Sequence, residues 1–196
     1  MGKPFVETFL QSWVYGGTLA GLTLLIVAIG LYGPLGTPLF VVFLLLPLYM
    51  VHQYEEHAGD RFRLFVDRWI GQGQPVLTHL AIFVINVPGV WGIYAVVFVL
   101  ASTIDIGFGL IAGYTTLVNA IAHIGQAAKM KLPNPGLVTA IVLFLPAAIW
   151  TIALLVGQGV PWGYHLLGIA CALGIHGLIV AHVLRRLRGF QIPASA

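Results

Sequence analysis

The sequence predicts an all-α membrane protein, a polytopic bundle of six transmembrane helices with one amphipathic helix in the membrane interface. The first observation is composition: of 196 residues, 59% are hydrophobic and 8% are charged, and the mean hydropathy is +0.97. A soluble domain needs roughly 25% charged residues to cover its surface, so lipid must cover this chain instead. The second observation is six apolar runs of spanning length, and the third is a one-sided distribution of Lys and Arg.

The six predicted spans form a single domain over residues 1–196. Each run is close to the ~20 residues that cross a bilayer core. Helix-breaking residues separate the runs, such as Gly33-Pro34 after the first and Pro133 to Gly136 before the fifth. A signal peptide competes for the first run, and a re-entrant second run would leave five spans. The expected spans are residues 13–32, 36–54, 79–101, 104–124, 137–157 and 162–184.

The basic residues predict the direction of the spans. Under a six-span count all nine Lys and Arg residues fall on one side of the membrane, and cytoplasmic loops carry the excess of such residues. We therefore expect an integral protein of the bacterial inner (cytoplasmic) membrane, with both termini in the cytoplasm. The residues concerned are Lys3, Arg61, Arg63, Arg68, Lys129, Lys131, Arg185, Arg186 and Arg188.

Residues 58–71 predict the interfacial helix. Phe62, Phe65, Val66 and Trp69 recur at helical spacing, which is typical of an amphipathic helix lying in the headgroup region. The alternative is a charged helix that only connects two spans. The charged residues of the other face are Asp60, Arg61, Asp67 and Arg68.

Ionisable residues gather near one membrane level in this topology. They are functional candidates because an ionisable group in a membrane is costly. Six of the seven His residues lie near the cytoplasmic ends of four different spans, and only His165 begins its span on the other side. The gathered residues are His52, Glu55, Glu56 and His57 of the second span, His79 of the third, Asn119 and His123 of the fourth, and His176 and His182 of the sixth.

This combination of residue types indicates a metal site. Imidazole and carboxylate groups bind zinc and first-row transition metals, and catalytic zinc sites often combine two His with one Glu and an open position for water. A metal-free hydrolase, in which Glu activates water and Asn stabilises an oxyanion, would use the same residues. The predicted ligands of zinc or iron are His52, Glu55, Glu56, His123, His176 and His182, and the predicted catalytic residues are Glu55, Glu56 and Asn119.

The segment His52-Gln53-Tyr54-Glu55-Glu56 resembles the motif that names the HXXEE-domain family of bacterial membrane proteins. The resemblance continues to Asn119-x-x-x-His123 and to His176 or His182, and it implies the choice of residues more than an activity. The chain is more remotely similar to intramembrane CAAX-protease-type hydrolases, which also combine a Glu-Glu pair with His and Asn on other helices. This chain departs from that pattern at two positions. An Arg follows the Glu-Glu pair after three residues in those hydrolases but after four here, at Arg61, and Val180 stands where they have Asn.

Three functions follow from these patterns. The first is a membrane metallohydrolase that acts on a lipid or lipidated substrate at the cytoplasmic leaflet. The second is a non-haem di-iron oxidoreductase of lipids, although the chain lacks the His-rich boxes of membrane desaturases. The third is not an enzyme, but a metal or proton transporter or a subunit of a membrane complex. The expected partners are membrane lipids and not nucleic acid, and an oligomer is a further possibility.

Overall fold

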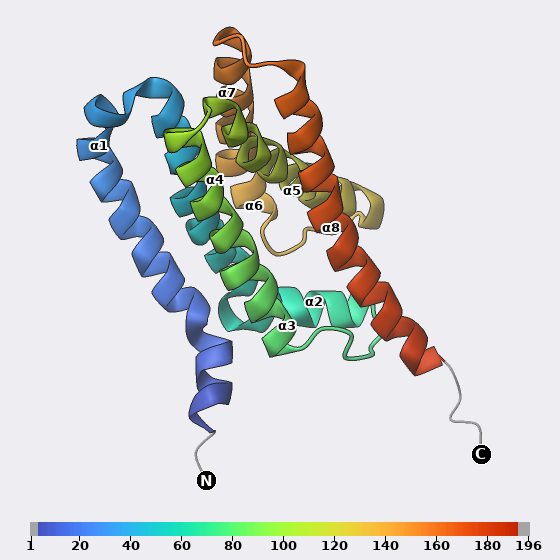
Figure 1. Ribbon diagram of the computed structural model, residues 1–196. Coiled ribbons are helices and arrows are strands. Elements are labelled where there is room, and N and C mark those ends of the chain that lie inside the picture. Colours follow the sequence, from blue (N-terminus) through green and yellow to red (C-terminus); the bar gives the residue numbers. More distant parts are fainter. Residues whose placement is uncertain (1–3, 192–196) are drawn as a thin grey trace.

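The computed structural model describes residues 4–191, and every element in that part of the chain is helical, which confirms the expected all-α class (Figure 1). The predicted cytoplasmic Lys3 lies outside the described residues. The α-helices are α1 (Phe5–His57), α2 (Arg61–Trp69), α3 (His79–Val84), α4 (Gly92–Thr103), α5 (Gly109–Met130), α6 (Leu137–Thr139), α7 (Leu145–Gly157) and α8 (Trp162–Gln191). Short 3-10 or π-helical turns join some of them: η1 (Ala58–Asp60), η2 (Ile85–Trp91), η3 (Ile106–Phe108) and η4 (Ala140–Phe144).

Helix α1 is folded back on itself at Gly36. This residue has a φ of 66° and a ψ of 161°, which are not helical values and which glycine adopts without steric cost. In a straight helix, residues 15 and 59 would lie roughly 66 Å apart at 1.5 Å per residue. Instead the Gly59 N–H donates a hydrogen bond to Tyr15 Oη at 3.3 Å. Figure 1 shows the first arm rising from the N-terminus and the second arm returning beside it.

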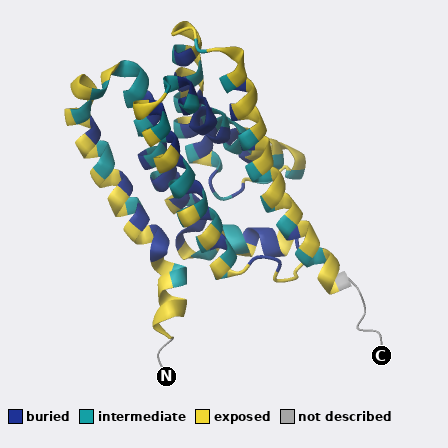
Figure 2. Cartoon of the chain, in the orientation of Figure 1, coloured by how far each residue is buried: buried dark blue, intermediate teal, exposed yellow. Residues whose placement is uncertain are grey.

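Within residues 4–191, five helical segments are long and apolar enough to cross a membrane, which supports the expected membrane protein. The count of six spans is not confirmed by this measure, because the first segment contains both arms of α1 together with α2. Figure 2 shows many exposed residues on the outer sides of the first arm and of α8, and large apolar side chains are among them. The five segments are Phe5–Trp69, His79–Thr103, Ile106–Met130, Leu137–Gly157 and Trp162–Phe190.

Helix α5 is central to the bundle and packs against α8, α7, α4 and the returning arm of α1. A buried core forms around it, with Leu45, Leu110, Phe144 and Leu155 fully enclosed. The helix also runs six residues past the predicted end at residue 124, because an apolar run can end before the helical backbone does. It stops where Lys131 adopts a left-handed conformation with φ 53°.

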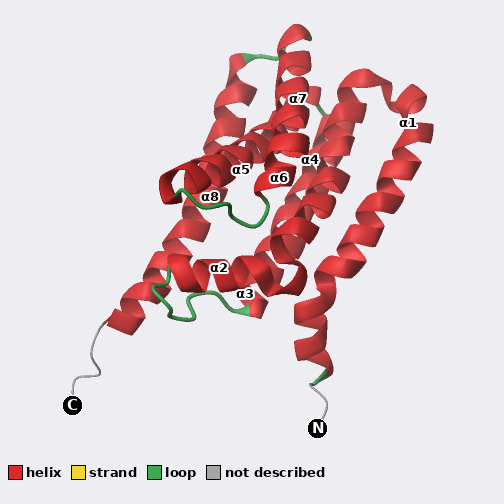
Figure 3. Cartoon of the chain, turned by 180° about the vertical axis from the view of Figure 1, so that it is seen from behind, coloured by secondary structure: helices red, strands yellow, loops and turns green. Residues whose placement is uncertain are grey.

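Helix α2 lies across one end of the bundle, at the same end as both termini (Figures 1 and 3). The predicted amphipathic segment 58–71 therefore forms η1 and the helix α2. Phe65 and Val66 are buried against the bundle, whereas Leu64 and Trp69 are exposed. Buried Asp67 anchors the helix to the following loop by accepting a hydrogen bond from the Leu77 N–H at 3.1 Å. Placement of α2 in the membrane interface stays a prediction.

Candidate metal centre

Two histidines and one glutamate meet inside the bundle where the returning arm of α1 crosses α5. His52 and Glu56 are four residues apart on α1, so they share one face of that helix. His52 Nε2 lies 3.6 Å from Glu56 Oε2, and His123 Nε2 of α5 lies 3.7 Å from Glu56 Oε1. One possible ligand atom from each residue lies within 4.8 Å of the other two, and all three residues are buried. We call this group the buried cluster.

The imidazole of His52 is oriented by Thr139 and Glu55. Thr139 Oγ1 donates to Glu55 Oε2 at 2.5 Å, so its lone pairs remain for His52 Nδ1, which lies 2.7 Å away. His52 therefore donates through Nδ1, and its Nε2 carries the lone pair that faces Glu56. This Nε2 is buried and has no hydrogen-bond partner in the described part of the chain.

The imidazole of His123 is oriented in the same way by Asn134. The Asn134 Nδ2 donates to the backbone carbonyl of His123 at 2.8 Å, which fixes the amide. Its Oδ1 then accepts from His123 Nδ1 at 2.9 Å. Both histidines of the buried cluster thus use Nδ1–H for an outer partner and direct Nε2 at Glu56. Metal-binding histidines are held by such outer hydrogen bonds.

Gly136 lets the loop backbone come close to both imidazoles. Its φ is 96°, a value that side chains with a Cβ rarely adopt. A Cβ at this position would lie 2.6 Å from His123 Cε1 and 2.9 Å from His52 Cε1. The loop before α6 therefore approaches both rings as closely as a residue without a side chain allows, and it sets the spacing between them.

Glu56 is a buried carboxylate whose ion-pair partners within residues 4–191 are all histidines. Besides His52 and His123, His57 Nε2 lies 3.2 Å from Glu56 Oε2. His57 is itself buried, and its ring packs against Trp13 and Phe62. A buried carboxylate needs a positive partner. A protonated imidazole or a bound cation would meet that need at this site.

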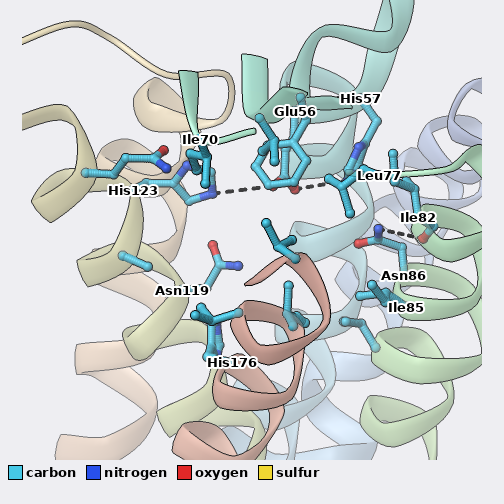
Figure 4. Close-up of a pocket in the computed structure, with 18 of the residues that line it drawn as sticks. Glu56, His57, Ile70, Leu77, Ile82, Ile85, Asn86, Asn119, His123 and His176 are labelled. Carbon is cyan, nitrogen blue, oxygen red and sulfur yellow. Dashed lines mark hydrogen bonds and ion pairs between the residues drawn. The ribbon is translucent and has the colours of Figure 1, made fainter. Parts of the chain in front are cut away.

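A cavity of about 310 Å³ adjoins the buried cluster. Figure 4 shows Glu56, His57 and His123 along one side of it, with Asn119 and His176 below them. Asn119 Nδ2 donates to Tyr49 Oη at 2.8 Å, and its buried Oδ1 has no hydrogen-bond partner in the described residues. His176 Nδ1 lies 2.8 Å from the backbone carbonyl of Ala172. Because a carbonyl oxygen can only accept, His176 is the donor in this hydrogen bond.

The structure brings together some of the residues predicted from sequence. His52, Glu56 and His123 form the buried cluster, and Asn119 and His176 line the adjoining cavity. Glu55 points instead to the start of the helix at residue 137, where it accepts from the N–H groups of Val138 and Thr139 at 3.1 and 2.7 Å. The assignments of Glu55, Glu56 and Asn119 as catalytic residues stay predictions, as do those of Glu55 and His176 as ligands.

The other histidines lie apart from the buried cluster. His182 is not among the residues that line the cavity. His79, at the start of α3, pairs with Asp60 of η1 at 3.4 Å, and His165 Nδ1 lies 2.9 Å from Tyr114 Oη. His182 as a ligand stays a prediction that no contact in the structure supports.

Sequence reasoning included His57 among the gathered residues without giving it a role, and it missed Thr139 and Asn134. His57 reads as an interfacial residue, because it follows the last apolar turn of the predicted span. Asn134 reads as part of a Pro-Asn-Pro turn, and Thr139 as an ordinary polar residue near a helix start. The position of Asn134 and Thr139 in the sequence could have indicated them, because both lie in the short segment that follows the span with His123.

The geometry of the buried cluster suits a metal ion. Two ligands of a tetrahedral metal, each ~2.1 Å from it, lie roughly 3.4 Å apart. The distances from His52 Nε2 to Glu56 Oε2, 3.6 Å, and from His123 Nε2 to Glu56 Oε1, 3.7 Å, are within a few tenths of an ångström of this value, and they run to the two oxygens of one carboxylate. Two imidazoles and one carboxylate match the ligand set of catalytic zinc sites that leave one position for water.

Comparison with known proteins gives one match. A family model described as "Protein of unknown function with HXXEE motif" matches residues 43–151, which include His52, Glu56 and His123. No curated protein and no solved structure matches the chain.

Proposed function

The chain belongs to the HXXEE family, whose function is unknown, and we propose that it is an integral membrane metal-dependent hydrolase acting on a lipid or lipidated substrate. The observation that carries this proposal is the buried cluster, in which outer hydrogen bonds direct two imidazole Nε2 atoms at one carboxylate. The adjoining cavity provides room for a substrate beside these groups. The metal is zinc or iron, and its proposed ligands are His52, Glu56 and His123.

The proposed reaction is hydrolysis of an acyl bond. A metal bound by three protein ligands supplies an activated water molecule. His57, whose Nε2 lies 3.2 Å from Glu56 Oε2, would serve as the base that receives a proton from the attacking water, and the water oxygen would bond to the acyl carbon. The bond from this carbon to the alcohol oxygen or amine nitrogen then breaks, and the leaving atom takes the proton from His57. Glu55 acts as a positioning residue, because it holds Thr139 against His52.

We further propose six membrane crossings in the bacterial inner membrane, with both termini cytoplasmic. The fold-back of α1 at Gly36 supports two crossings in its length. The basic residues of α2 and of the end of α8 lie at the end of the molecule where the chain begins and ends (Figure 1). If this end of the bundle faces the cytoplasm, the position of the basic residues agrees with the positive-inside rule.

A di-iron oxidoreductase has less support. Carboxylate-bridged iron pairs take ligands from four helices, with several glutamates among them. The described residues contain one group suited to a metal, with a single carboxylate. A transporter or a subunit of a complex would carry a metal without turnover, so an activity measurement separates these functions from a hydrolase.

Purified protein in vesicles of total bacterial lipid tests the proposal, with released fatty acid measured by mass spectrometry. We expect a chelator to abolish release and Zn²⁺ or Fe²⁺ to restore it. His57→Gln should lower the rate by roughly 10²-fold or more while metal remains bound, as for loss of a general base. His79→Gln is the matched control and should leave the rate unchanged. Release that survives the chelator, or His57→Gln with the wild-type rate, would contradict the proposal.

A further inference from the structure

The cavity beside the buried cluster is apolar over most of its wall. Helix α8 contributes one continuous stripe, because its lining residues fall at positions i, i+3, i+4, i+7 and i+8. These residues are His176, Ile179, Val180, Val183 and Leu184. Figure 4 shows apolar side chains of the segment after α2, of α3 and of η2 on the remaining wall. They include Ile70, Leu77, Ile82 and Ile85.

Contacts at both ends of this stripe hold α8 in place. At one end Gly168 lies so close to α5 that a Cβ there would be 2.7 Å from Tyr114 Cδ2, and Tyr114 Oη also contacts His165. At the other end Arg186 Nη2 donates to the Pro75 carbonyl at 3.3 Å. The cavity lies between these two attachments, so it is a formed feature of the packing.

The cavity reaches the outer surface of the bundle on its α5 and α8 side. Ala122 of α5 and Val180 and Leu184 of α8 line it and are also exposed. Leu173 and Leu178 are further exposed apolar side chains of α8. Lipid covers such a face in a membrane protein. A lipid chain would therefore enter from the bilayer without crossing water.

Several polar side chains of the cavity wall belong to the buried cluster or lie beside it, whereas Asn86 lies next to Ile82 and Ile85 (Figure 4). The residues of the first group are Glu56, His57, His123 and Asn119. Asn119 Oδ1 is a buried acceptor without a hydrogen-bond partner in the described residues, and leaving such an acceptor unpaired is unfavourable. A donor on the ligand would satisfy it. The ligand is thus expected to be apolar along its length and to carry an N–H or O–H near its reacting end.

We propose that this cavity binds a single-chain acyl lipid whose head carries a hydrogen-bond donor to Asn119 Oδ1. The chain lies along the α8 stripe, and the carbonyl lies beside the buried cluster. The volume of about 310 Å³ is at the lower end of small-molecule sites, which span roughly 300–1,000 Å³, and it suits one chain better than a two-chain lipid. Identification of the reacting carbonyl rests on the proposed function, whereas chain binding does not.

Photo-crosslinking in nanodiscs tests chain binding. A diazirine-bearing N-acyl amide is applied to chelator-treated protein, so that the outcome does not depend on metal or turnover. We expect label on peptides of α8 and α2 that line the cavity. Ile179→Trp should reduce this labelling at least tenfold, because the larger side chain fills the cavity. Leu178→Trp is the matched control, because Leu178 is the next residue before Ile179 but is exposed and does not line the cavity.

Equal labelling of Ile179→Trp and Leu178→Trp would overturn the proposal, as would label spread evenly over the lipid-facing side chains. Loss of labelling in both variants, with unchanged thermal unfolding, would also contradict it. If cavity labelling is found but chelator does not affect hydrolysis, the cavity stands and the proposed function fails. Failure of chain binding can therefore be distinguished from failure of the proposed hydrolase function.

The head group is tested by competition with three unlabelled lipids of one chain length. These are an N-acyl amide with an N–H, a monoacyl ester with a free hydroxyl, and a methyl ester without a donor. We expect at least one donor lipid to compete about tenfold better than the methyl ester, and Asn119→Leu to remove this preference. The donor lipid that competes better shows whether an N–H or an O–H group donates the hydrogen bond to Asn119 Oδ1. Equal competition by all three, or a preference that persists in Asn119→Leu, would exclude the role of Asn119.

Discussion

Two acid–histidine groups lie near His57, and they differ in burial and in partners. The first is the buried cluster of His52, Glu56 and His123. The second, which we call the outer cluster, consists of Asp60, Arg63 and His79. Asp60 pairs closely with Arg63 and lies 3.4 Å from His79 Nε2. The side chains of Asp60 and His79 are 29% and 30% exposed, whereas that of His52 is fully buried.

The difference shows why residue type alone does not define a metal site. Arg63 already neutralises Asp60 and also pairs with Asp67 at 3.0 Å, and surrounding water screens the charges. Glu56 has no such guanidinium among its described partners, and both neighbouring histidines are oriented through Nδ1. The buried cluster therefore has donor atoms and charge available for a cation, and the outer cluster does not.

Replacement of the acidic residue in each cluster by its amide should give the largest difference in metal affinity. Glu56→Gln removes the proposed carboxylate ligand and should lower metal affinity by 100-fold or more, measured by competition with a chromophoric chelator. Asp60→Asn should leave metal affinity within about twofold of wild type. Similar losses in the two variants would show that the clusters do not differ as described.

Gly136→Ala should have the next largest effect. The new Cβ would meet both imidazoles at under 3 Å, so the rings must move apart. We expect roughly 10–100-fold weaker metal binding, of the order found when outer support of a ligand is lost, and a lower melting temperature. Gly73→Ala is the control, because Gly73 also has a positive φ of 85° but nothing within 4 Å of a Cβ. Equal metal binding by the two variants would contradict the close approach.

Thr139→Val tests the orientation of His52. The substitution keeps the shape of the side chain but removes the hydroxyl that contacts His52 Nδ1 and Glu55. Metal affinity should fall roughly tenfold. Thr151→Val is a suitable control, since the buried Thr151 hydroxyl bonds only within its own helix in the described structure, to the Ala147 carbonyl. A metal affinity equal to that of the control would mean that His52 needs no outer partner.

Glu55→Gln should have the smallest effect. The carboxylate accepts the N–H groups of Val138 and Thr139 at a helix start, and an amide oxygen can still accept one of them. Loss of the negative charge there should reduce the free energy of unfolding by about 1 kcal/mol, with metal affinity reduced only a few-fold. Denaturant unfolding and chelator competition measure the two effects. An effect as large as that of Glu56→Gln would make Glu55 a ligand, as the sequence alone suggests.

The helices and part of the buried cluster could be predicted from sequence because both depend on local patterns. Apolar runs placed the long helices, and the predicted bounds 137–157 agree with the combined extent of α6, η4 and α7. The i,i+4 spacing of His52 and Glu56 correctly placed them on one face. The direction of Glu55 could not be predicted, because it depends on where the segment after residue 136 returns to α1. Asn134 likewise acts through a loop conformation that spacing does not encode.

The most direct test of the buried cluster is elemental analysis combined with X-ray absorption spectroscopy of the purified chain. We expect close to one zinc or iron per chain, with a first coordination shell of two imidazoles and one carboxylate together with a water-type oxygen. Glu56→Gln should lose this signal, and Asp60→Asn should keep it. A wild-type chain that binds no metal after incubation with Zn²⁺ and Fe²⁺, or a metal that remains in Glu56→Gln with an unchanged spectrum, would contradict the assignment of this site.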